Sequence, residues 1–133
     1  MSAKYLVEVE AKLNRFPRRT SKQNPESYIG GGNSRLDYLG LRVPHLRLTH
    51  SEGFSFYKFS DDEIVKIWDF IWNQSNCFEV LALALIWFYE PKQRSILAKN
   101  WSVLNSWANR IDNWAHSDTL SGIYARILED NPK

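Results

Sequence analysis

Trp114 and Asp118 are the two residues whose types and spacing best suit a reactive site. They lie four positions apart in a segment whose apolar residues recur at three- and four-residue steps, the pattern of a helix with one buried face. That face would consist of Leu120, Ile123, Tyr124, Ile127 and Leu128. At about 100° per residue, Asp118 lies roughly 150° and Trp114 roughly 110° from its centre, so both are predicted to point away from the core. A carboxylate beside an indole could form the wall of a site.

An ordinary structural role explains the same pair equally simply. An acidic residue near the start of a helix is stabilised by the helix dipole, by about 0.3–1 kcal/mol at most and by less beyond the first turn. A tryptophan on a helix surface can pack against a neighbouring helix. Spacing alone therefore leaves both interpretations of Trp114 and Asp118 open.

Other residue types that carry chemistry do not form a recognisable site. His45 and His50 are five positions apart in a loop-like region and lack the glutamate of a zinc-protease motif, so we expect solvated or capping residues. His116 lies nearer the buried stripe and is not expected to pair with Asp118. The single cysteine, Cys77, excludes an internal disulfide and a cysteine-rich zinc site. No Gly-x-Ser-x-Gly elbow occurs, so we do not expect a serine nucleophile. We also expect neither a metal nor a cofactor.

The segments that would position these residues read as helices joined by short loops. Sustained alternation typical of strands is absent, and so are the Asn-Gly and Asp-Gly turns of hairpins. Residues 49–59 are interpreted as a loop whose aromatic side chains tuck into the core. The pattern predicts an all-α fold in which antiparallel helix pairs stack as a helical repeat. The expected helices cover residues 2–16, about two turns from Pro44, 61–72, 78–89, a stretch after Pro91, and 112–129.

Two of these helices carry recognisable start signals. Ser60 followed by Glu63 has the form of a capping box, and Asn76 with Glu79 repeats the pattern. Residues 78–89 are apolar on nearly all sides apart from Glu79, so this helix is predicted to be buried on most of its surface.

The six tryptophans are many for a chain of 133 residues. Most are expected in the core, because aromatic side chains dominate burial. Trp107 and Trp114, which flank a polar stretch, are the expected exceptions. Exposed indoles are suited to stacking on a nucleobase or to holding a cation over the ring face.

Composition indicates one globular domain. Apolar residues make up 44% of the 133 residues, and the net charge is +2. The charge is uneven: residues 1–47 and 92–133 are basic and residues 48–91 are acidic, a distribution compatible with a phosphate backbone as partner. No run of eighteen apolar residues and no signal-like N-terminus occurs, so we expect no membrane contact and a cytoplasmic location.

Three stretches together resemble a known family. Residues 38–44, Tyr-Leu-Gly-Leu-Arg-Val-Pro, are similar to its hydrophobic-Leu-Gly-x-x-x-Pro loop, and residues 67–69 with 78–89 are similar to its next two helices. Residues 107–118 contain Trp114 and Asp118 at the positions of its Trp-x-x-x-Asp signature. The family is that of the DNA alkylation repair glycosylases of the AlkD type, which are built of HEAT-like helical repeats. The resemblance implies a short HEAT-like solenoid and excision of cationic N3- or N7-alkylated purines from double-stranded DNA.

The resemblance also implies roles for individual residues. Asp118 would stabilise the oxocarbenium-like transition state and orient a water, and Trp114 would hold the cationic lesion. The residues expected to contact DNA are Tyr28, Arg42, Arg47, Trp107 and Arg110, the three arginines from their charge and loop position.

The chain departs from the family pattern in two respects. Ala115 stands where the family usually has an acid directly after the site tryptophan. Family members run past residue 133, so we expect residues 1–133 to be a single helical-repeat domain, the N-terminal portion of a longer solenoid. Its exposed C-terminal helix face would then allow self-association. The alternative function is a non-catalytic HEAT-like module that binds nucleic acid or protein. A purely structural scaffold would require a buried Trp114 and a salt-bridged Asp118.

Overall fold

The structure, a computed structural model, describes residues 3–16, 36–37, 39–112 and 114–130, with the main chain alone at Trp114. The regular elements among these residues are all helices, apart from one isolated bridge between Asp37 and Cys77, which confirms the all-α prediction. The α-helices are α1 (Ala3–Asn14), α3 (Val43–Glu52), α4 (Asp61–Gln74), α5 (Phe78–Tyr89), α6 (Trp101–Trp107) and α7 (Trp114–Asp130). Short 3₁₀ helices connect them: η1 (Ser55–Lys58), η2 (Pro91–Ile96), η3 (Ala98–Asn100) and η4 (Ala108–Arg110).

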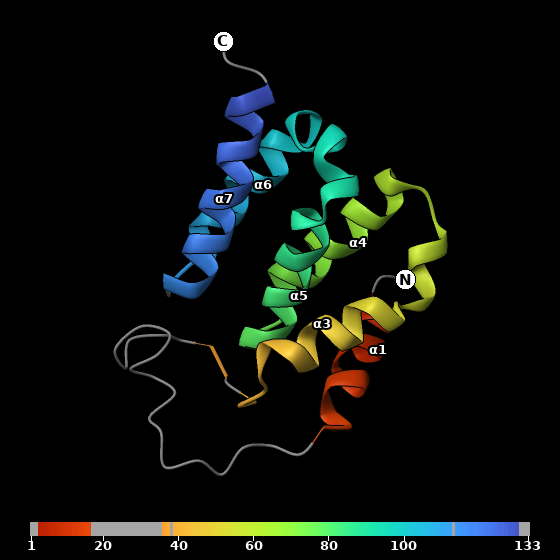
Figure 1. The fold of residues 1–133 in the computed structure, drawn as a ribbon. Coiled ribbons are helices and arrows are strands. Elements are labelled where there is room, and N and C mark those ends of the chain that lie inside the picture. Colours follow the sequence, from red (N-terminus) through yellow and green to blue (C-terminus); the bar gives the residue numbers. More distant parts are fainter. Residues whose placement is uncertain (1–2, 17–35, 38, 113, 131–133) are drawn as a thin grey trace.

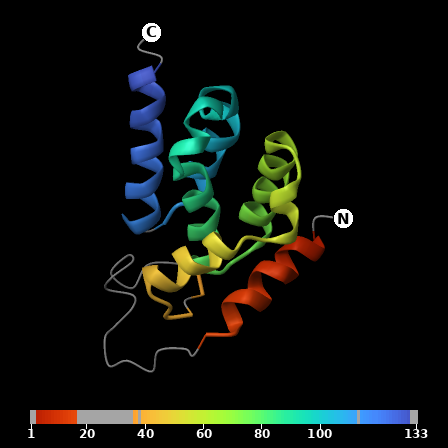
Figure 2. The same ribbon diagram turned by 45° about the vertical axis from the view of Figure 1, so that its right-hand side comes forward.

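Helix α5 is the centre of the molecule. It packs against α1, α3, α4 and α7, which surround it in both views (Figures 1 and 2). Its sequence is apolar on almost every side, and its buried side chains include Leu81, Leu83 and Leu85, each fully inaccessible to solvent. The prediction that residues 78–89 form a helix buried on most sides is confirmed. Burial of this kind contributes about 1.5–3 kcal/mol per large apolar side chain.

Helix α4 begins as its sequence predicts. The Ser60 side chain accepts a hydrogen bond from the Glu63 N–H at 3.3 Å, and three acidic residues occupy the first turn. The cap and the acids stabilise the positive end of the helix. Its inner face carries Trp68 and Trp72, which are completely buried: the Trp68 ring packs against Phe56 of η1, and the Trp72 ring stacks on Trp107 of α6.

The start of α5 corrects the sequence interpretation of Glu79. The N-cap residue is Cys77, and no side chain caps the helix. The Glu79 carboxylate instead accepts hydrogen bonds from the backbone N–H groups of Leu39, Gly40 and Leu41, at 3.0, 3.0 and 3.1 Å. A fully buried carboxylate without such donors would be costly, so the loop and the acid stabilise one another.

Gly40 has the conformation that this loop requires. Its φ of 78° lies in the left-handed region, which residues with a side chain rarely adopt. The turn directs the three consecutive N–H groups at one carboxylate and leads into α3, where Pro44 occupies the first turn. The same segment pairs with the start of α5 through the Asp37 N–H to Asn76 and the Phe78 N–H to Asp37 hydrogen bonds. The start of α3 is thereby fixed against α5.

Two element boundaries and the exposure of one residue differ from the predicted ones. Helix α3 continues to Glu52, so the expected loop 49–59 is partly helical, although its aromatic residues are tucked in as predicted. The stretch after Pro91 is broken into 3₁₀ turns before α6. Near the end of this stretch the Asn100 side chain hydrogen bonds to the Ile96 carbonyl, and a side-chain bond of this kind competes with the helix backbone. In α7 the predicted buried stripe is correct except for Leu128, which is 66% exposed.

Helices α5 and α7 approach each other closely at Tyr89, the last residue of α5. A Cβ atom at Gly122 would lie 2.8 Å from a ring carbon of Tyr89, so only glycine allows this approach. One turn further along α7, the Arg126 guanidinium lies over the Tyr89 ring, 3.8 Å from its centroid, and donates a hydrogen bond to the Tyr89 carbonyl. The Tyr89 ring thus contacts α7 at both Gly122 and Arg126.

Within the described part of the chain, no helix combines the length and the apolar character needed to cross a lipid bilayer.

We predict that Glu79→Gln lowers the free energy of unfolding by about 1–3 kcal/mol, the range for leaving buried hydrogen-bonding groups unsatisfied. The amide retains one acceptor oxygen but turns an NH₂ group toward backbone donors. Urea denaturation at pH 7 measures the change. Glu10→Gln on α1, whose carboxylate makes no contact of this kind, is the matched control. Equal stability of the two variants would contradict the proposed role of Glu79.

Candidate functional site

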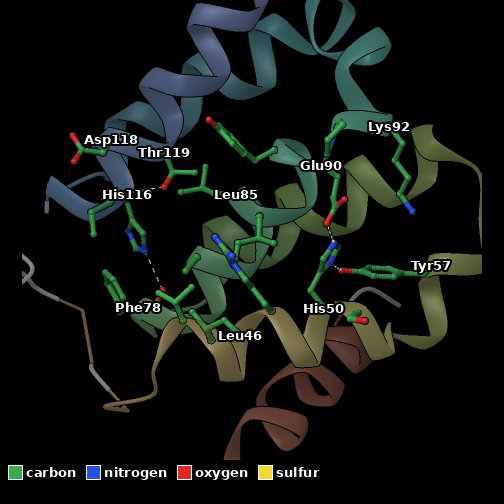
Figure 3. Close-up of a pocket in the computed structure, with 18 residues that line it drawn as sticks. Leu46, His50, Tyr57, Phe78, Leu85, Glu90, Lys92, His116, Asp118 and Thr119 are labelled. Carbon is green, nitrogen blue, oxygen red and sulfur yellow. Dashed lines mark hydrogen bonds and ion pairs between the residues drawn. The ribbon is translucent and has the colours of Figure 1, made fainter.

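A cleft of about 860 Å³ lies between α3, α5 and α7 (Figure 3). Its floor is α5, and its two walls are α3 and the first turns of α7. This volume falls within the usual range for small-molecule and cofactor sites, about 300–1,000 Å³. The lining is mostly apolar, and its polar members are Arg47, His50, Ser51, Tyr57, Glu90, Lys92, His116, Asp118 and Thr119.

Asp118 lies at the α7 edge of this cleft. It is exposed, and within the part of the chain that the structure describes its carboxylate makes no hydrogen bond or ion pair. The predicted orientation away from the core is confirmed. An unpaired carboxylate at the edge of a cleft is available to an incoming cation or water, which contradicts the salt-bridged Asp118 of the scaffold interpretation.

His116 faces the opposite way from Asp118, as Figure 3 shows. It is only 2% exposed, its ring stacks on Phe78 with centroids 4.4 Å apart, and its Nε2 lies 3.0 Å from the Phe78 carbonyl oxygen. Since a carbonyl only accepts, Nε2 carries the hydrogen. Burial lowers the pKa of His116 to about 4, against the opposing effects of that hydrogen bond and of Asp112. The prediction that His116 forms no dyad with Asp118 agrees with these contacts.

A hydrogen-bonded network of three side chains lies at the other end of the cleft. His50 lies between Tyr57, whose hydroxyl is 2.7 Å from Nδ1, and Glu90, whose carboxylate is 2.9 Å from Nε2 (Figure 3). Burial lowers the pKa of His50 although Glu90 raises it, and burial raises the pKa of Tyr57. With a neutral imidazole, the Tyr57 hydroxyl donates to Nδ1 and the Nε2 hydrogen is donated to Glu90.

This network was missed from the sequence, which predicted a solvated or capping role for His50. The physical reason is that its partners lie seven and forty residues along the chain, on η1 and at the end of α5. Tertiary packing of α3 on α5 brings them together. Spacing within one helix contains no signal for such a contact.

Two basic side chains line the cleft without a partner. Arg47 on α3 and Lys92 on η2 make no hydrogen bond or ion pair among the described residues, and the same is true of the exposed Arg42 at the start of α3. Arg42 and Arg47 were predicted as phosphate contacts, and they lie on the α3 side of the cleft. Lys92 was not predicted, because nothing in the sequence around Pro91 distinguishes it from other surface lysines.

The structure engages Arg110 elsewhere. Its guanidinium donates to the carbonyl oxygens of Trp72 and Ser75 and to the Asn76 side chain. The carbonyl groups of Trp72, in the last turn of α4, and of the C-cap residue Ser75 have no hydrogen-bond donor within the helix. Arg110 therefore caps α4 and does not line the cleft.

The prediction that Trp107 is an exposed indole is wrong. Trp107 is completely buried, it stacks on Trp72 with centroids 4.5 Å apart and an interplanar angle of 7°, and its Nε1–H donates to Asp69 at 2.8 Å. Asp69 on α4 satisfies the polar end of the indole, which lets the ring enter the core despite its polar sequence neighbours. Trp107 is not available for stacking on a base.

Two predicted site residues cannot be placed. Tyr28 lies outside the described residues, and so does the side chain of Trp114, although the main chain of Trp114 begins α7. Among the described residues, no cluster of three or more His, Cys, Asp or Glu side chains could hold a metal ion.

Comparison with known proteins identifies a family for this sequence. The model of a family described as DNA alkylation repair enzyme matches residues 9–133. The chain belongs to this family. No match was found among curated proteins or among solved structures.

The family match spans α3, α5 and α7, the three elements that line the cleft. Membership in the DNA alkylation repair family indicates a role in the repair of alkylated DNA, with DNA as the substrate. With DNA as the substrate, the unpaired Asp118 and the unpaired cations Arg47 and Lys92 can be considered as parts of one site.

We predict that lowering the pH from 7 to 5 reduces the free energy of unfolding through His116. Its folded pKa of about 4 lies below the ordinary value of 6.5, so between these values the unfolded chain binds a proton that the folded chain does not. The contribution of neutral His116 to the free energy of unfolding is complete above pH 6.5 and is lost as the pH falls toward 4. The loss is about 1.4 kcal/mol per pH unit below 6.5, so it amounts to roughly 2 kcal/mol at pH 5.

Urea denaturation of the wild type and of His116→Phe at both pH values isolates this effect. The phenyl ring retains the stacking on Phe78 and cannot be protonated. His50, whose pKa is also lowered, and Glu79, whose pKa burial raises, contribute to both proteins alike. The same pH dependence in the two proteins would contradict the assignment to His116.

Proposed function

We propose that the protein is a DNA glycosylase of the AlkD type that excises cationic N3- or N7-alkylated purines from double-stranded DNA. The observation that carries the proposal is the exposed, unpaired carboxylate of Asp118 at the edge of the cleft in a chain of the DNA alkylation repair family. Among the described residues the Asp118 carboxylate has no hydrogen-bond or ion-pair partner, so it is free to face a cationic substrate.

The reaction needs little more than a well-placed anion. The bond between the sugar C1′ and the purine nitrogen breaks, its electron pair leaves with the base, and the positive charge of the alkylated purine is neutralised. Charge develops on the sugar, where Asp118 stabilises the oxocarbenium-like transition state electrostatically. A water then attacks C1′, and Asp118 accepts its proton. Preorganised charge of this kind contributes about 2.7–4 kcal/mol per group in other enzymes.

Trp114 precedes Asp118 by one helical turn in α7. In the proposed complex it holds the cationic base or its sugar against the carboxylate, a contribution of about 0.5–2 kcal/mol for a cation over an indole face. The small Ala115 and the Thr119 side chain, whose hydroxyl bonds back to the Ala115 carbonyl, line the same stretch of the cleft.

The unpaired cations of α3 and η2 would bind the DNA backbone. Arg42, Arg47 and Lys92 carry charges that no acid neutralises within the described chain. Phosphate contacts supply most of the sequence-independent affinity of DNA-binding proteins. Arg110 is not included, because its guanidinium caps α4.

A HEAT-like arrangement of the helices is part of the proposal. Helices α4 and α5 pack together and are joined by residues 75–77 alone, as expected of an antiparallel helix pair. The cleft floor and walls would form the inner surface of such a stack. The exposed Leu128 and the half-exposed Trp101 leave apolar surface near the end of α7, which supports self-association there.

The alternative is a HEAT-like module that binds nucleic acid or protein without catalysis. Ala115 favours it, because the family usually has an acid at this position. The two functions differ in whether methylated purine is released.

We predict that Asp118→Asn lowers the single-turnover rate of methylpurine release from alkylated DNA at least about 100-fold, because the amide lacks the charge that stabilises the transition state. Binding to undamaged DNA is expected to stay within about twofold. Asp61→Asn on α4, away from the cleft, is the control and should keep the wild-type rate. Wild-type chain that binds DNA but releases no base at high protein concentration would support the non-catalytic module instead.

We further predict that Arg47→Gln and Lys92→Gln each reduce the slope of log affinity against log salt concentration by about one, since each removes one phosphate contact. Fluorescence anisotropy of labelled duplex DNA between low and high salt measures the slope. Lys66→Gln on the exposed side of α4 is the matched control. Unchanged slopes in both cleft variants would remove these residues from the DNA interface.

A further inference from the structure

We infer that His116 is the positioning residue of the site: its hydrogen bond to the Phe78 carbonyl fixes the rotation of α7 and thereby the direction of the Asp118 carboxylate. The catalytic consequence rests on the proposed function. The positional consequence does not, because it concerns only how α7 is held on α5.

The geometry places His116 and Asp118 on nearly opposite sides of one helix. Two residues correspond to about 200° of rotation. His116 points into the contact with α5 and Asp118 points out of it, as Figure 3 shows. Rotation of the first turns of α7 therefore cannot move one side chain without moving the other.

The His116 contact is directional as well as close. The ring stacks on Phe78 at an interplanar angle of 14° and lies 5.9 Å from the Trp72 ring, so it is confined between α5 and α4. Stacking alone would allow the ring to slide in its plane. The Nε2 to carbonyl hydrogen bond of 3.0 Å removes that freedom and sets the register of α7 on α5.

The start of α7 needs such a contact. The first four N–H groups of a helix have no acceptor within it, so the first turns are the least stable part. Among the described residues of these turns, Thr119 also has a hydrogen-bonded side chain, and it bonds to α7 itself. The hydrogen bonds of Tyr124 to Leu104 and of Arg126 to Tyr89 hold α7 to its neighbours farther along. His116 holds the turns that carry Asp118.

The neutral imidazole suits this role. Burial keeps the pKa of His116 at about 4, so at neutral pH it donates a hydrogen bond without placing a positive charge near the Asp118 carboxylate. Asp112, just before α7, is the acidic group that raises this pKa, and no lysine or arginine contributes to it. A charged donor in the same position would weaken the anion that the proposed reaction uses.

The test compares three variants of the whole chain. His116→Phe retains the stacking and loses the donor, His116→Gln returns an N–H donor, and Tyr124→Phe removes the α7 hydrogen bond to the Leu104 carbonyl away from the cleft. We expect His116→Phe to lower the single-turnover rate of base release at least tenfold with DNA affinity unchanged. His116→Gln should recover the rate to within about threefold, and Tyr124→Phe should keep the wild-type rate. A wild-type rate in His116→Phe, or equal losses in His116→Phe and Tyr124→Phe, would overturn the inference.

Hydrogen exchange provides a measurement that does not depend on activity. We expect the amides of residues 118–120 to exchange at least tenfold faster in His116→Phe than in the wild type and in Tyr124→Phe. Unchanged exchange would overturn the positioning role. If the wild type releases no base but the exchange pattern is as expected, the proposed function fails while the inference about α7 stands.

Discussion

The hydrogen bonds between the Glu79 carboxylate and the N–H groups of residues 39–41 are the constraint on which the cleft depends. A completely buried carboxylate is tolerated only where donors surround it, and three consecutive backbone N–H groups supply them here. The requirement acts in both directions: the acid needs the loop, and the loop needs a residue such as Gly40 that can turn its amides to one point. Because the loop leads directly into α3, the position of one cleft wall is set from within α5.

Charge is distributed across the cleft in a way that suits a nucleic-acid substrate. Acidic side chains lie at the two ends, where Asp118 is free and Glu90 is bound to His50, while Arg47 and Lys92 lie among the lining residues of α3 and η2. A polyanion is attracted by the cations, and a cationic base within it is attracted by the free acid. The overall charge of +2 conceals this arrangement, since the acids and bases nearly cancel when they are summed.

Periodicity predicted the helices that are held by their own apolar faces, including α4, α5 and α7, and it predicted correctly that Asp118 faces away from the core. It failed where a polar group is satisfied by a distant partner. Trp107 can be buried because Asp69 accepts the hydrogen bond of its N–H. Glu79 was predicted to cap α5, but its carboxylate accepts hydrogen bonds from the N–H groups of residues 39–41 instead. Such contacts connect positions about forty residues apart, and no local pattern encodes them. The same applies to the contact of His50 with Glu90, forty residues away, while Tyr57 is only seven residues away but lies on a separate element, η1.

The Tyr89 ring, fitted against Gly122, has a consequence for how a partner is accommodated. Together with the His116 contact it holds α7 to α5 at two separated points along this wall of the cleft. We expect a wall that is held at two points to leave most of the change of shape to the substrate. In the proposed complex the duplex would then bend or unstack, and damaged sites would be selected by how easily the surrounding base pairs deform as well as by their charge.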